Sequence, residues 1–514
     1  MFPSTLRRVA AYGGLATAAA RLRLSRSEHA SRQAHQLLCD RLGRLRGLPQ
    51  KLGQMWSFRN TDEAAESASL YAPLQENADP LPWREIEPVL LAAWGEPLSR
   101  LVTEIDHHGL AASLGQVHKA RLRDGRAVSV KVQYPGIRQA VDTDLGALGW
   151  LAIPLGTPSR GFDLNTWKEA IRRDLDQELD YRQEAQEQQA FAAEWAEDAD
   201  IVVPRVINSL SDERVLVTTW EEGEHWDAVR SDWPTADRRQ LAATLARFFL
   251  RGLFRHGRMQ ADWHPGNLRF RRGGVRPQIV IYDFGCVCRP SPGERLALVR
   301  LIRATITQAE SPWPLLLALG FNARLLEPIS AKLPAVCRLL FEPFCESRPY
   351  DIADWRLAER MASVLGDDRW NFRLAGPPRL FGVLRAFHGL IHYLRGLAVP
   401  LDWHSLFFAA ISGLTVELDT LALPATASRP GFDQLATWLK IRVRENGITK
   451  VQLTQAASAI ERLEDLLDDD LRRNIAEQQI QLDEIVAGVR QRAYAPGPVF
   501  EWNQGGKQIM VWME

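Results

Sequence analysis

The stretch from Gly257 to Cys286 constrains this chain more than any other segment of its 514 residues. It contains a loop in which Asp262 and Asn267 stand five residues apart, with His, Pro and Gly between them. A short apolar run at 279–282 then leads directly into Asp283-Phe284-Gly285. Carboxylate and amide oxygens are ligands that Mg²⁺ accepts in phosphate-handling sites. The pattern therefore predicts a loop and a strand that together present metal-binding oxygens.

Protein kinases carry these residue types in the same order, with Asp and Asn in a catalytic loop and Asp-Phe-Gly after a strand. There the first Asp accepts or orients the proton of the nucleophile, so Asp262 is predicted to be catalytic. The Asn and the second Asp hold Mg²⁺ on the ATP phosphates, so Asn267 and Asp283 are predicted metal ligands. Asp-Phe-Gly alone recurs by chance. The three residues in this order strongly indicate a phosphoryl-transfer centre.

The segments upstream of this centre alternate as strands do. The predicted strands of a five-stranded small lobe are 101–105, 114–122, 127–133, 201–206 and 214–220. The third strand reads Val-Ser-Val-Lys-Val and matches the V-A-I-K pattern, so Lys131 is predicted to contact the α- and β-phosphates. The alternative is a solubilising lysine on a sheet edge. Its place directly after the Asp124-Gly125 hairpin turn favours the catalytic interpretation.

A loop of small residues separates the first two predicted strands. It reads Leu110-Ala111-Ala112-Ser113, at the position where kinases have a Gly-rich loop over the phosphates. Ala111, Ala112 and Ser113 are therefore predicted to contact the nucleotide. Because alanine has a Cβ atom, these residues restrict how closely the backbone amides approach a phosphate.

A polar helix from Leu164 to about Glu197 is predicted to supply a glutamate for Lys131. Asp180 and Glu184 are one turn apart and share a face of this helix, a like-charge pair that a cation would relieve. The ammonium of Lys131 and a bound Mg²⁺ are the two candidate cations. The alternative is an ordinary solvated acidic face.

The sequence after Asp-Phe-Gly differs from that of ordinary protein kinases. Ser291-Pro292-Gly293-Glu294 has the form of a capping box, so a helix is predicted to begin within about ten residues and to exclude a long activation loop. Ala-Pro-Glu is also absent, so the sequence does not support a peptide acceptor. Further on, His388 and His392 stand four apart, as metal-binding pairs do. Their apolar surroundings favour core or interface histidines instead.

Composition excludes several other classes of protein. Lys plus Arg and Asp plus Glu are equal at 63 each, so no nucleic-acid partner is expected. The five cysteines include no CxxC pair, which argues against a zinc site or a disulfide scaffold and favours a reducing compartment. No segment reaches the roughly twenty apolar residues of a membrane span.

Both ends of the chain have predicted structure of their own. Near the start, a helix from about Ser25 to Phe58 places Lys51 and Gln54 on one face, where a solvated surface lysine is the alternative to a functional one. Near the end, a linker at 421–430 precedes two predicted hairpins separated by an acidic helix. One further hypothesis is that these terminal strands recruit a partner by edge pairing.

Several motifs taken together resemble those of the UbiB family of atypical kinase-like proteins, called the ADCK group in eukaryotes. Lys51-Leu52-Gly53-Gln54 matches its KxGQ motif, Ala111-Ala112-Ser113 its alanine-rich loop, Glu178-Leu179-Asp180 its ExD motif, and 262–267 its catalytic loop with HPGN. Lys131, Glu184 and Asp283 occupy the positions common to kinases. The sequence departs from the pattern at Leu110, where alanine usually opens the loop, and at Ser129, two residues before the lysine.

The resemblance implies a two-lobed, protein-kinase-like α+β fold. Its expected parts are an N-terminal helical extension with KxGQ at 1–95, an N-lobe at 96–224, a helical C-lobe at 225–418 and a small C-terminal α+β module at 419–514. In the family the KxGQ helix lies across the site near the ExD acids, which implies a regulatory role for Lys51, Gln54, Glu178 and Asp180. The family's paired membrane-spanning tail is absent from this sequence, so we expect a cytoplasmic protein whose membrane contact would be peripheral.

The resemblance also implies ATP or ADP with Mg²⁺ as ligands, and isoprenoid lipids or their biosynthetic enzymes as partners. The first hypothesis is an ATPase or a small-molecule or lipid kinase that supports the biosynthesis of ubiquinone or another isoprenoid lipid, with Lys131, Glu184 and Asp262 as catalytic residues. The alternative is a nucleotide-gated protein that binds lipids or partners without performing chemistry.

Overall fold

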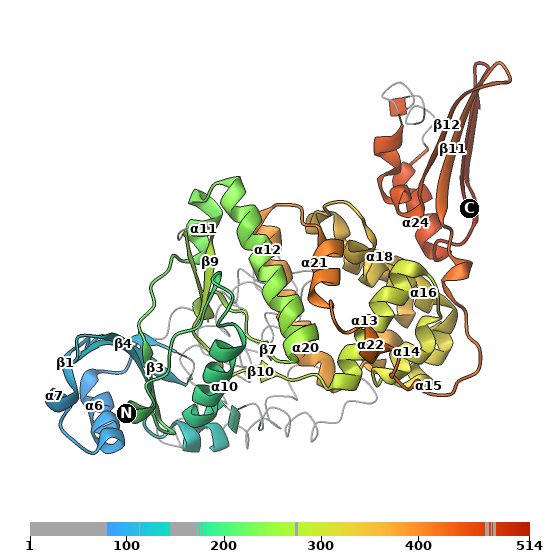
Figure 1. Ribbon diagram of the computed structural model, residues 1–514. Helices are drawn as coiled ribbons and strands as arrows, with labels where there is room; N and C mark the ends of the chain where they lie inside the picture. The colour runs from blue at the N-terminus through green and yellow to red at the C-terminus, as the bar shows by residue number, and fades with distance from the viewer. Residues whose placement is uncertain are drawn as a thin grey trace, which may run out of the picture. The chain divides into compact units, whose positions relative to one another are not determined.

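The computed structural model describes residues 80–112, 114–143, 172, 175–176, 178–272, 276–467, 472–473, 475 and 480–514 (Figure 1). The chain forms two compact units. The first comprises the chain up to Leu245 with Gln260–Cys288 and Arg385–Leu390. The second comprises Ala246–Met259, Arg289–Leu384 and Ile391–Glu514. Among the described residues, no helix has both the length and the apolar character needed to cross a membrane.

The first unit contains an antiparallel five-stranded sheet. Its strands are β1 (Val102–Ile105), β2 (Leu110–Ala111), β3 (Gly115–Leu122), β4 (Ala127–Gln133) and β6 (Val215–Thr219), in the order β1-β3-β4-β6 with β2 on β3. Val128, Val130 and Val132 of β4 are fully buried in one core with Ile86 and Leu90 of helix α6 (Trp83–Trp94). Because side chains alternate along a strand, Lys131 projects from the opposite face of β4.

The sequence correctly predicted a sheet of five strands, but one of the strands assigned to it belongs to another sheet. The strand predicted at 201–206 forms only β5 (Ile201–Val202), which pairs in parallel with β9 (Gln278–Ile281) in a separate sheet of order β5-β9-β8, with β8 at Leu268–Arg271. Pro204 follows β5 and has no N–H to donate to a ladder. Beyond it, Val206 makes only an isolated bridge to Thr218 of β6. The fifth strand of the larger sheet is β2.

The long helix predicted from 164 to 197 is interrupted at the ExD segment. Helix α10 (Tyr181–Glu194) begins after Asp180, whose extended backbone (φ −120°) and side chain cap it by accepting the Arg182 N–H at 3.0 Å. An aspartate is a favourable N-cap, and its side chain competes with continued helix. Asp180 therefore does not share a helical face with Glu184, contrary to the prediction.

Helices α11 (Trp226–Asp232) and α12 (Thr235–Arg251) follow the sheet, and a π-helical turn (Gly252–His256) extends α12. This run ends at Gly257, whose left-handed conformation (φ 65°) lets its N–H bond the Gly252 carbonyl. The catalytic-loop region then contains β7 (Met259–Gln260), the 3₁₀ turn Pro265–Asn267 and β10 (Val287–Cys288).

The second unit is largely helical. Ser291 and Glu294 form the predicted capping box at the start of α13 (Pro292–Thr307). The helices that follow are α14 (Pro312–Ala318), α15 (Ala323–Leu326), α16 (Leu333–Leu340), α17 (Glu342–Cys345), α18 (Leu357–Leu365), α19 (Arg369–Ala375), α20 (Phe381–Leu397), α21 (Trp403–Ala410) and α22 (Thr415–Leu418). Residues 385–390 of α20 group with the first unit.

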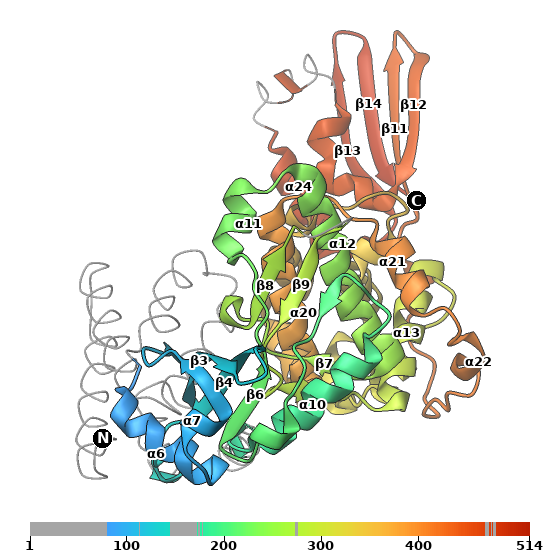
Figure 2. The same cartoon turned by 60° about the vertical axis from the view of Figure 1, so that its left-hand side comes forward.

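The last part of the second unit is a four-stranded antiparallel sheet with helix α24 (Leu482–Gln491) beside it (Figure 2). The strands β11 (Trp438–Glu445), β12 (Ile448–Ala456), β13 (Gly497–Gln504) and β14 (Lys507–Met513) run in the order β12-β11-β14-β13. Asn446 and Gly447 both have positive φ, as a tight hairpin turn requires. Where an acidic helix was predicted, residues Ala457–Leu466 form 3₁₀ structure with a kink at Arg462.

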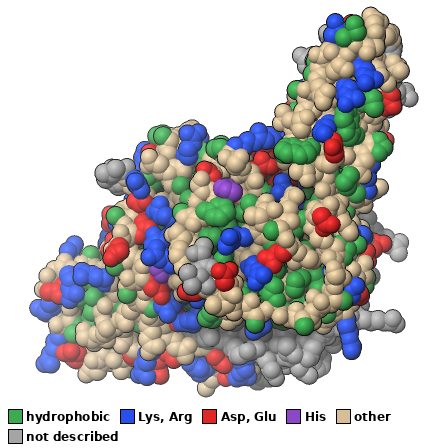
Figure 3. Space-filling model, turned by 45° about the vertical axis from the view of Figure 1, so that its right-hand side comes forward, with side chains coloured by type: hydrophobic (Ala, Val, Ile, Leu, Met, Phe, Trp, Pro, Cys, Tyr) green, Lys and Arg blue, Asp and Glu red, His purple; other side chains and the backbone are tan. Residues whose placement is uncertain are grey.

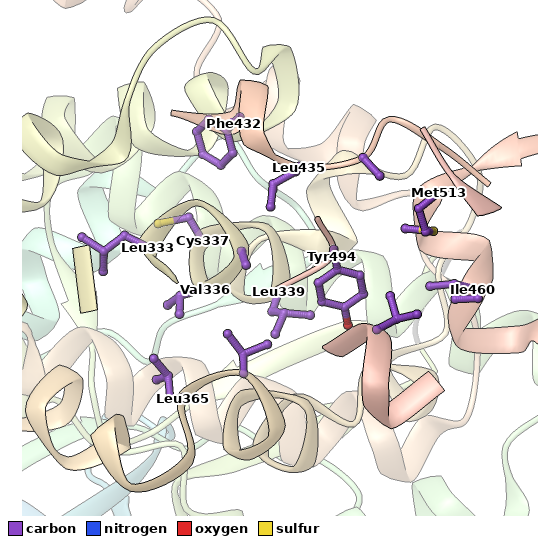
Figure 4. Close-up of a cluster of buried hydrophobic side chains, with 14 of the residues drawn as sticks. Leu333, Val336, Cys337, Leu339, Leu365, Phe432, Leu435, Ile460, Tyr494 and Met513 are labelled. Carbon is purple, nitrogen blue, oxygen red and sulfur yellow. The ribbon is translucent and has the colours of Figure 1, made fainter. Parts of the chain in front are cut away.

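One hydrophobic core joins this sheet to the helices of the second unit. Leu333, Val336 and Leu339 of α16 lie in the same buried cluster as Phe432, Ile460, Tyr494 and Met513 (Figure 4). On the molecular surface shown in Figure 3, basic and acidic side chains are interspersed.

Candidate active site

Three charged side chains from distant parts of the sequence meet in the first unit. The Lys131 ammonium lies 2.7 and 2.9 Å from the two carboxylate oxygens of Glu184 and 2.9 Å from Oδ2 of Asp283. Lys131 projects from the face of β4 away from α6, Glu184 lies in the first turn of α10, and Asp283 follows β9. The structure thus brings together the kinase-type Lys, Glu and Asp that the sequence identified in three separate segments.

The neighbouring Phe284 fixes the Asp-Phe-Gly segment against α10. Its ring is 1% exposed and its centroid lies 4.9 Å from that of Phe191. Its backbone N–H points to Glu184 Oε1 at 3.4 Å. Oδ1 of Asp283 accepts the Gly285 N–H at 2.9 Å, so both oxygens of this carboxylate are held.

Burial and charge shift the three pKa values in different directions. Burial raises the pKa of Glu184 to about 7, against the opposing effect of Lys131. The pKa of Asp283 is lowered despite burial, because Lys131 and the Gly285 N–H stabilise its charge. Burial opposes the charge of Lys131, but Asp283 and Glu184 together raise the pKa of its ammonium well above the usual value. The lysine is therefore a fixed cation.

Hydrogen bonds fix the backbone of the catalytic loop. Gln260, which is 2% exposed, donates from Nε2 to the Asp262 carbonyl at 2.6 Å and to the Asp283 carbonyl at 3.4 Å. Asn267 Nδ2 donates to the same Asp262 carbonyl at 3.1 Å, and Trp263 Nε1 donates to the Gln260 carbonyl at 2.9 Å. Gln260 ties the loop to the Asp-Phe-Gly segment, a role that its sequence position two residues before Asp262 did not reveal.

The predicted metal ligands fit Mg²⁺ by their chemistry and by their placement. Asn267 and Asp283 flank the antiparallel pair β8 and β9, where Leu268 faces Ile281 and the Tyr282 N–H bonds the Asn267 carbonyl at 3.0 Å. Because the Asn267 amide nitrogen donates to the loop, its oxygen is the atom left to face a metal ion. One amide and one carboxylate oxygen are a typical protein contribution to a Mg²⁺ site completed by phosphates and water.

The described part of the alanine-rich segment pairs with β3. Leu110 and Ala111 pair with Val117 and Gln116, and the Ala112 N–H bonds the Gly115 carbonyl at 2.8 Å. A Cβ atom at Gly115 would lie 2.3 Å from the Val132 carbonyl oxygen, so this glycine allows β3 to approach β4 closely. Ser113 lies outside the described residues.

The predicted regulatory residues fall partly outside the described chain. Lys51 and Gln54 belong to the undescribed N-terminal residues. Glu178 lies beside the Asp-Phe-Gly segment, since a Cβ atom on Gly285 would stand 3.5 Å from Glu178 Cγ. Asp180 caps α10.

The histidine pair of α20 corrects one expectation. His388 and His392 are both exposed, so they are not core histidines, and the alternative that they lie at an interface stays a prediction. Their spacing along the helix, with Phe381 and Leu384, places them on its outward face. Within the described part of the chain, no cluster of three or more His, Cys, Asp or Glu side chains could hold a metal ion.

Arg385 of α20 also contacts the catalytic loop, and no sequence pattern indicated this contact. Its Nη2 lies 2.9 Å from Asp262 Oδ1, and its Nη1 lies 3.5 Å from Cys286 Sγ. The guanidinium is largely buried, and burial opposes its charge, but Cys286, Asp262 and Glu178 raise its pKa. No motif links a residue so far along the chain to Asp262.

Residues 73–311, which contain this whole charge cluster except Arg385, match the ABC1 atypical kinase-like domain. The chain therefore contains an ABC1 atypical kinase-like domain, which supports its resemblance to the UbiB family. Its kinase-like fold combines helices and sheets.

Curated relatives of the chain include mitochondrial atypical kinases. The chain is 34% identical over 248 residues to atypical kinase coq-8 of Caenorhabditis elegans, covering 48% of this chain and 33% of that protein. It is 28% identical over 365 residues to atypical kinase COQ8 of Saccharomyces cerevisiae, covering 69% of this chain and 71% of that one. The match thus spans only a third of the nematode protein's length.

A solved structure has a similar fold. Rv3197 of Mycobacterium tuberculosis, solved as a complex with erythromycin, is 27% identical, with a TM-score of 0.53. The likeness covers 75% of this chain and 97% of that one.

Proposed function

We propose that this protein binds ATP or ADP with Mg²⁺ and transfers the γ-phosphoryl group of ATP to water or to a small or lipid acceptor. The observation that carries the proposal is the Lys131 ammonium, held within 2.9 Å of both Glu184 and Asp283. In protein kinases the same Lys–Glu pair and Asp-Phe-Gly aspartate must both be in place for phosphoryl transfer.

Each site residue then has a defined role. Lys131 binds the α- and β-phosphates, and Glu184 holds the lysine in position. Asn267 and Asp283 would hold Mg²⁺, which neutralises charge that develops on the phosphates. The nucleotide is covered by Ala111, Ala112 and Ser113. Their Cβ atoms keep the backbone amides farther from the phosphates than the glycines of a Gly-rich loop would.

Asp262 accepts the proton of the attacking hydroxyl or water. The acceptor oxygen forms a bond to the γ-phosphorus while the bond from that phosphorus to the β–γ bridging oxygen breaks, and ADP leaves. The proton passes from Asp262 to solvent after the step. This assignment requires only positioning and charge stabilisation, which supply most of the catalysis in phosphoryl transfer.

A small acceptor fits the local structure better than a peptide. Helix α13 begins at Pro292, shortly after Gly285, so the described chain has no long activation segment between them. The names of the COQ8 relatives and the family resemblance support isoprenoid-lipid biosynthesis, ubiquinone included, as the context. They also support a partner among its lipids or enzymes, and a peripheral membrane contact. Erythromycin, bound by the Mycobacterium tuberculosis relative, is a small molecule and not a peptide.

The test is ADP release with Mg²⁺ in the presence and absence of isoprenoid-lipid vesicles. We expect turnover by the wild type, and a loss of about 100-fold or more in Asp262→Asn and in Asp283→Asn. Asp367→Asn, at an exposed carboxylate of the second unit, is the matched control and should retain the wild-type rate. Equal rates in all four proteins would end the catalytic claim and leave nucleotide-gated lipid or partner binding as the function.

A further inference from the structure

The catalytic loop of this chain contains no basic residue of its own next to the candidate base. The loop reads Gln260-Ala261-Asp262-Trp263-His264, whereas protein kinases have H-R-D at the first three of these positions. Gln260 takes the place of the His and Ala261 that of the Arg. The side chain of Ala261 cannot carry a charge, and the Arg385 guanidinium contacts Asp262 from helix α20.

Close packing brings α20 to the loop. Gly389, one turn after Arg385, lies directly against Trp263, because a Cβ atom at Gly389 would stand 2.3 Å from Trp263 Cβ. Trp263 is itself 3% exposed and bonded to the Gln260 carbonyl. The glycine therefore permits an approach that sets the position of Arg385, and the tryptophan that it contacts directly follows Asp262.

We propose that Arg385 is the positioning residue for Asp262, a cation delivered by α20 in place of one from the loop. This inference rests on the proposed function. The bond from Nη2 to Oδ1 fixes one oxygen of the carboxylate and hence the direction of the other, which accepts the proton of the acceptor. Proton transfer requires that oxygen within hydrogen-bond reach of the acceptor, so a rotated carboxylate slows the step without weakening nucleotide binding.

Asp262 has charged neighbours on more than one element. Arg385 contacts it from α20, and Asp283 is the acidic neighbour whose charge interacts with it. Glu178 and Cys286 act on Arg385 itself, and Lys131 is committed to Glu184 and Asp283.

A purely structural role is the competing explanation, since a buried guanidinium needs a carboxylate partner wherever it lies. The two roles differ in kinetics. A structural arginine would alter stability and nucleotide binding together, whereas a positioning arginine alters kcat at a constant KM for ATP.

The experiment compares Arg385→Gln and Arg385→Lys with the wild type in ADP release and in nucleotide binding. Arg385→Gln should lower kcat about 100-fold and change KM for ATP less than twofold. Arg385→Lys should restore part of kcat, because it returns the charge without the planar two-point contact. Arg395→Gln, at an exposed arginine on the same helix, is the control and should match the wild type.

The double variant Asp262→Asn/Arg385→Gln separates action through Asp262 from other effects. If Arg385 acts through Asp262, the double variant should be no slower than Asp262→Asn alone. A kcat for Arg385→Gln equal to that of the wild type, or equal losses in kcat and nucleotide affinity, would overturn this proposal while leaving the proposed function standing. Failure of the wild type to release ADP would overturn both.

Discussion

At the scale of single residues, the site depends on one lysine between two carboxylates. The side chains of Lys131, Glu184 and Asp283 are 17%, 1% and 30% exposed, so water screens their interactions weakly. The cluster carries one more negative than positive charge when all three groups are ionised. A bound cation would offset this excess negative charge, which fits a site arranged for a phosphate-bound metal ion.

Lys131→Met is expected to destabilise the first unit and to abolish nucleotide binding. Removing one partner of a buried ion pair leaves uncompensated charge, at a cost of about 3 kcal/mol. Urea unfolding of the wild type and the variant measures the loss, with nucleotide titration alongside. Lys119→Met is the control, because Lys119 is 47% exposed and pairs with the 80% exposed Glu222. Equal stability of the Lys131 and Lys119 variants would contradict the account of the buried cluster.

The raised pKa of Glu184 predicts that the stability of the folded protein depends on pH. This pKa is raised from 4.5 to about 7 in the folded protein, so the folded state binds the proton more tightly than the unfolded state. The contribution of this tighter proton binding to the free energy of unfolding is fully present below pH 4.5 and is lost as the pH rises through about 7. Asp283 has a lowered pKa and Lys131 a strongly raised one, so neither changes charge in this window.

Wild type and Glu184→Gln should therefore diverge between pH 5 and pH 7. We expect the wild type to lose about 2 kcal/mol relative to the variant across this range, measured by urea unfolding at several pH values. A difference between the two proteins that stays constant with pH would show that Glu184 is already ionised throughout.

Residue-level prediction from sequence succeeded where local pattern and chemistry coincide. The Val-Ser-Val-Lys-Val strand identified Lys131, because strand alternation alone decides which face of the sheet the lysine occupies. The Asp-Phe-Gly segment after a short apolar strand identified Asp283. Arg385 and Gln260 were missed for different reasons. Arg385 contacts Asp262 only because a helix far along the chain packs on the catalytic loop. Gln260 donates to two backbone carbonyls, and every residue has a carbonyl, so no sequence pattern indicates which ones it bonds.

At the scale of elements, a single glycine sets how closely α20 packs on the catalytic loop. Sequence predicted helices in this region, but not which turn of which helix would contact Trp263. The same limit explains the errors at β5 and α10. The sequence contains Pro204 and Asp180, which can end a strand and cap a helix. Whether they do so depends on the residues that pack against them in the folded protein.

Gly389→Ala tests this packing against a matched glycine elsewhere. Its added Cβ would stand 2.3 Å from Trp263 Cβ, so we expect a destabilisation of about 1–3 kcal/mol and a lower kcat. Gly488→Ala lies inside helix α24 with no atom within 4 Å of the added Cβ, and should stabilise by about 0.5–1 kcal/mol. Urea unfolding compares the two variants. A neutral Gly389→Ala would mean that α20 does not depend on this contact.

At the scale of the whole molecule, the segments beside the C-terminal sheet are bound to the helices of the second unit by buried charges as well as by apolar packing. Arg360 of α18 is 1% exposed and bonds Glu342 at 2.9 and 2.6 Å and Glu461 at 3.3 Å. Arg490 of α24 bonds Glu461 at 2.6 Å, and Tyr494 contacts both Arg360 and Glu461. Sequence predicted the hairpins of this sheet but not this network, because its members are scattered charged residues.

Arg360→Gln should therefore destabilise the second unit by about 3–5 kcal/mol, since it leaves two buried carboxylates without their shared partner. Arg356→Gln is the control. Its side chain is 56% exposed and pairs with Glu359 on the surface, so its loss should cost less than about 1 kcal/mol. Thermal unfolding measures both. Similar melting temperatures for the two variants would show that the network contributes little.

The central claim is that Lys131, Asn267 and Asp283 form one Mg²⁺-dependent nucleotide site. The most direct measurement is calorimetric titration of ATP and ADP into the wild type and Asp283→Asn, each with Mg²⁺ and with a chelator. We predict that Mg²⁺ tightens binding to the wild type at least tenfold and has no such effect on Asp283→Asn. Binding by the wild type that is absent, or that is equally tight with the chelator, would contradict the account.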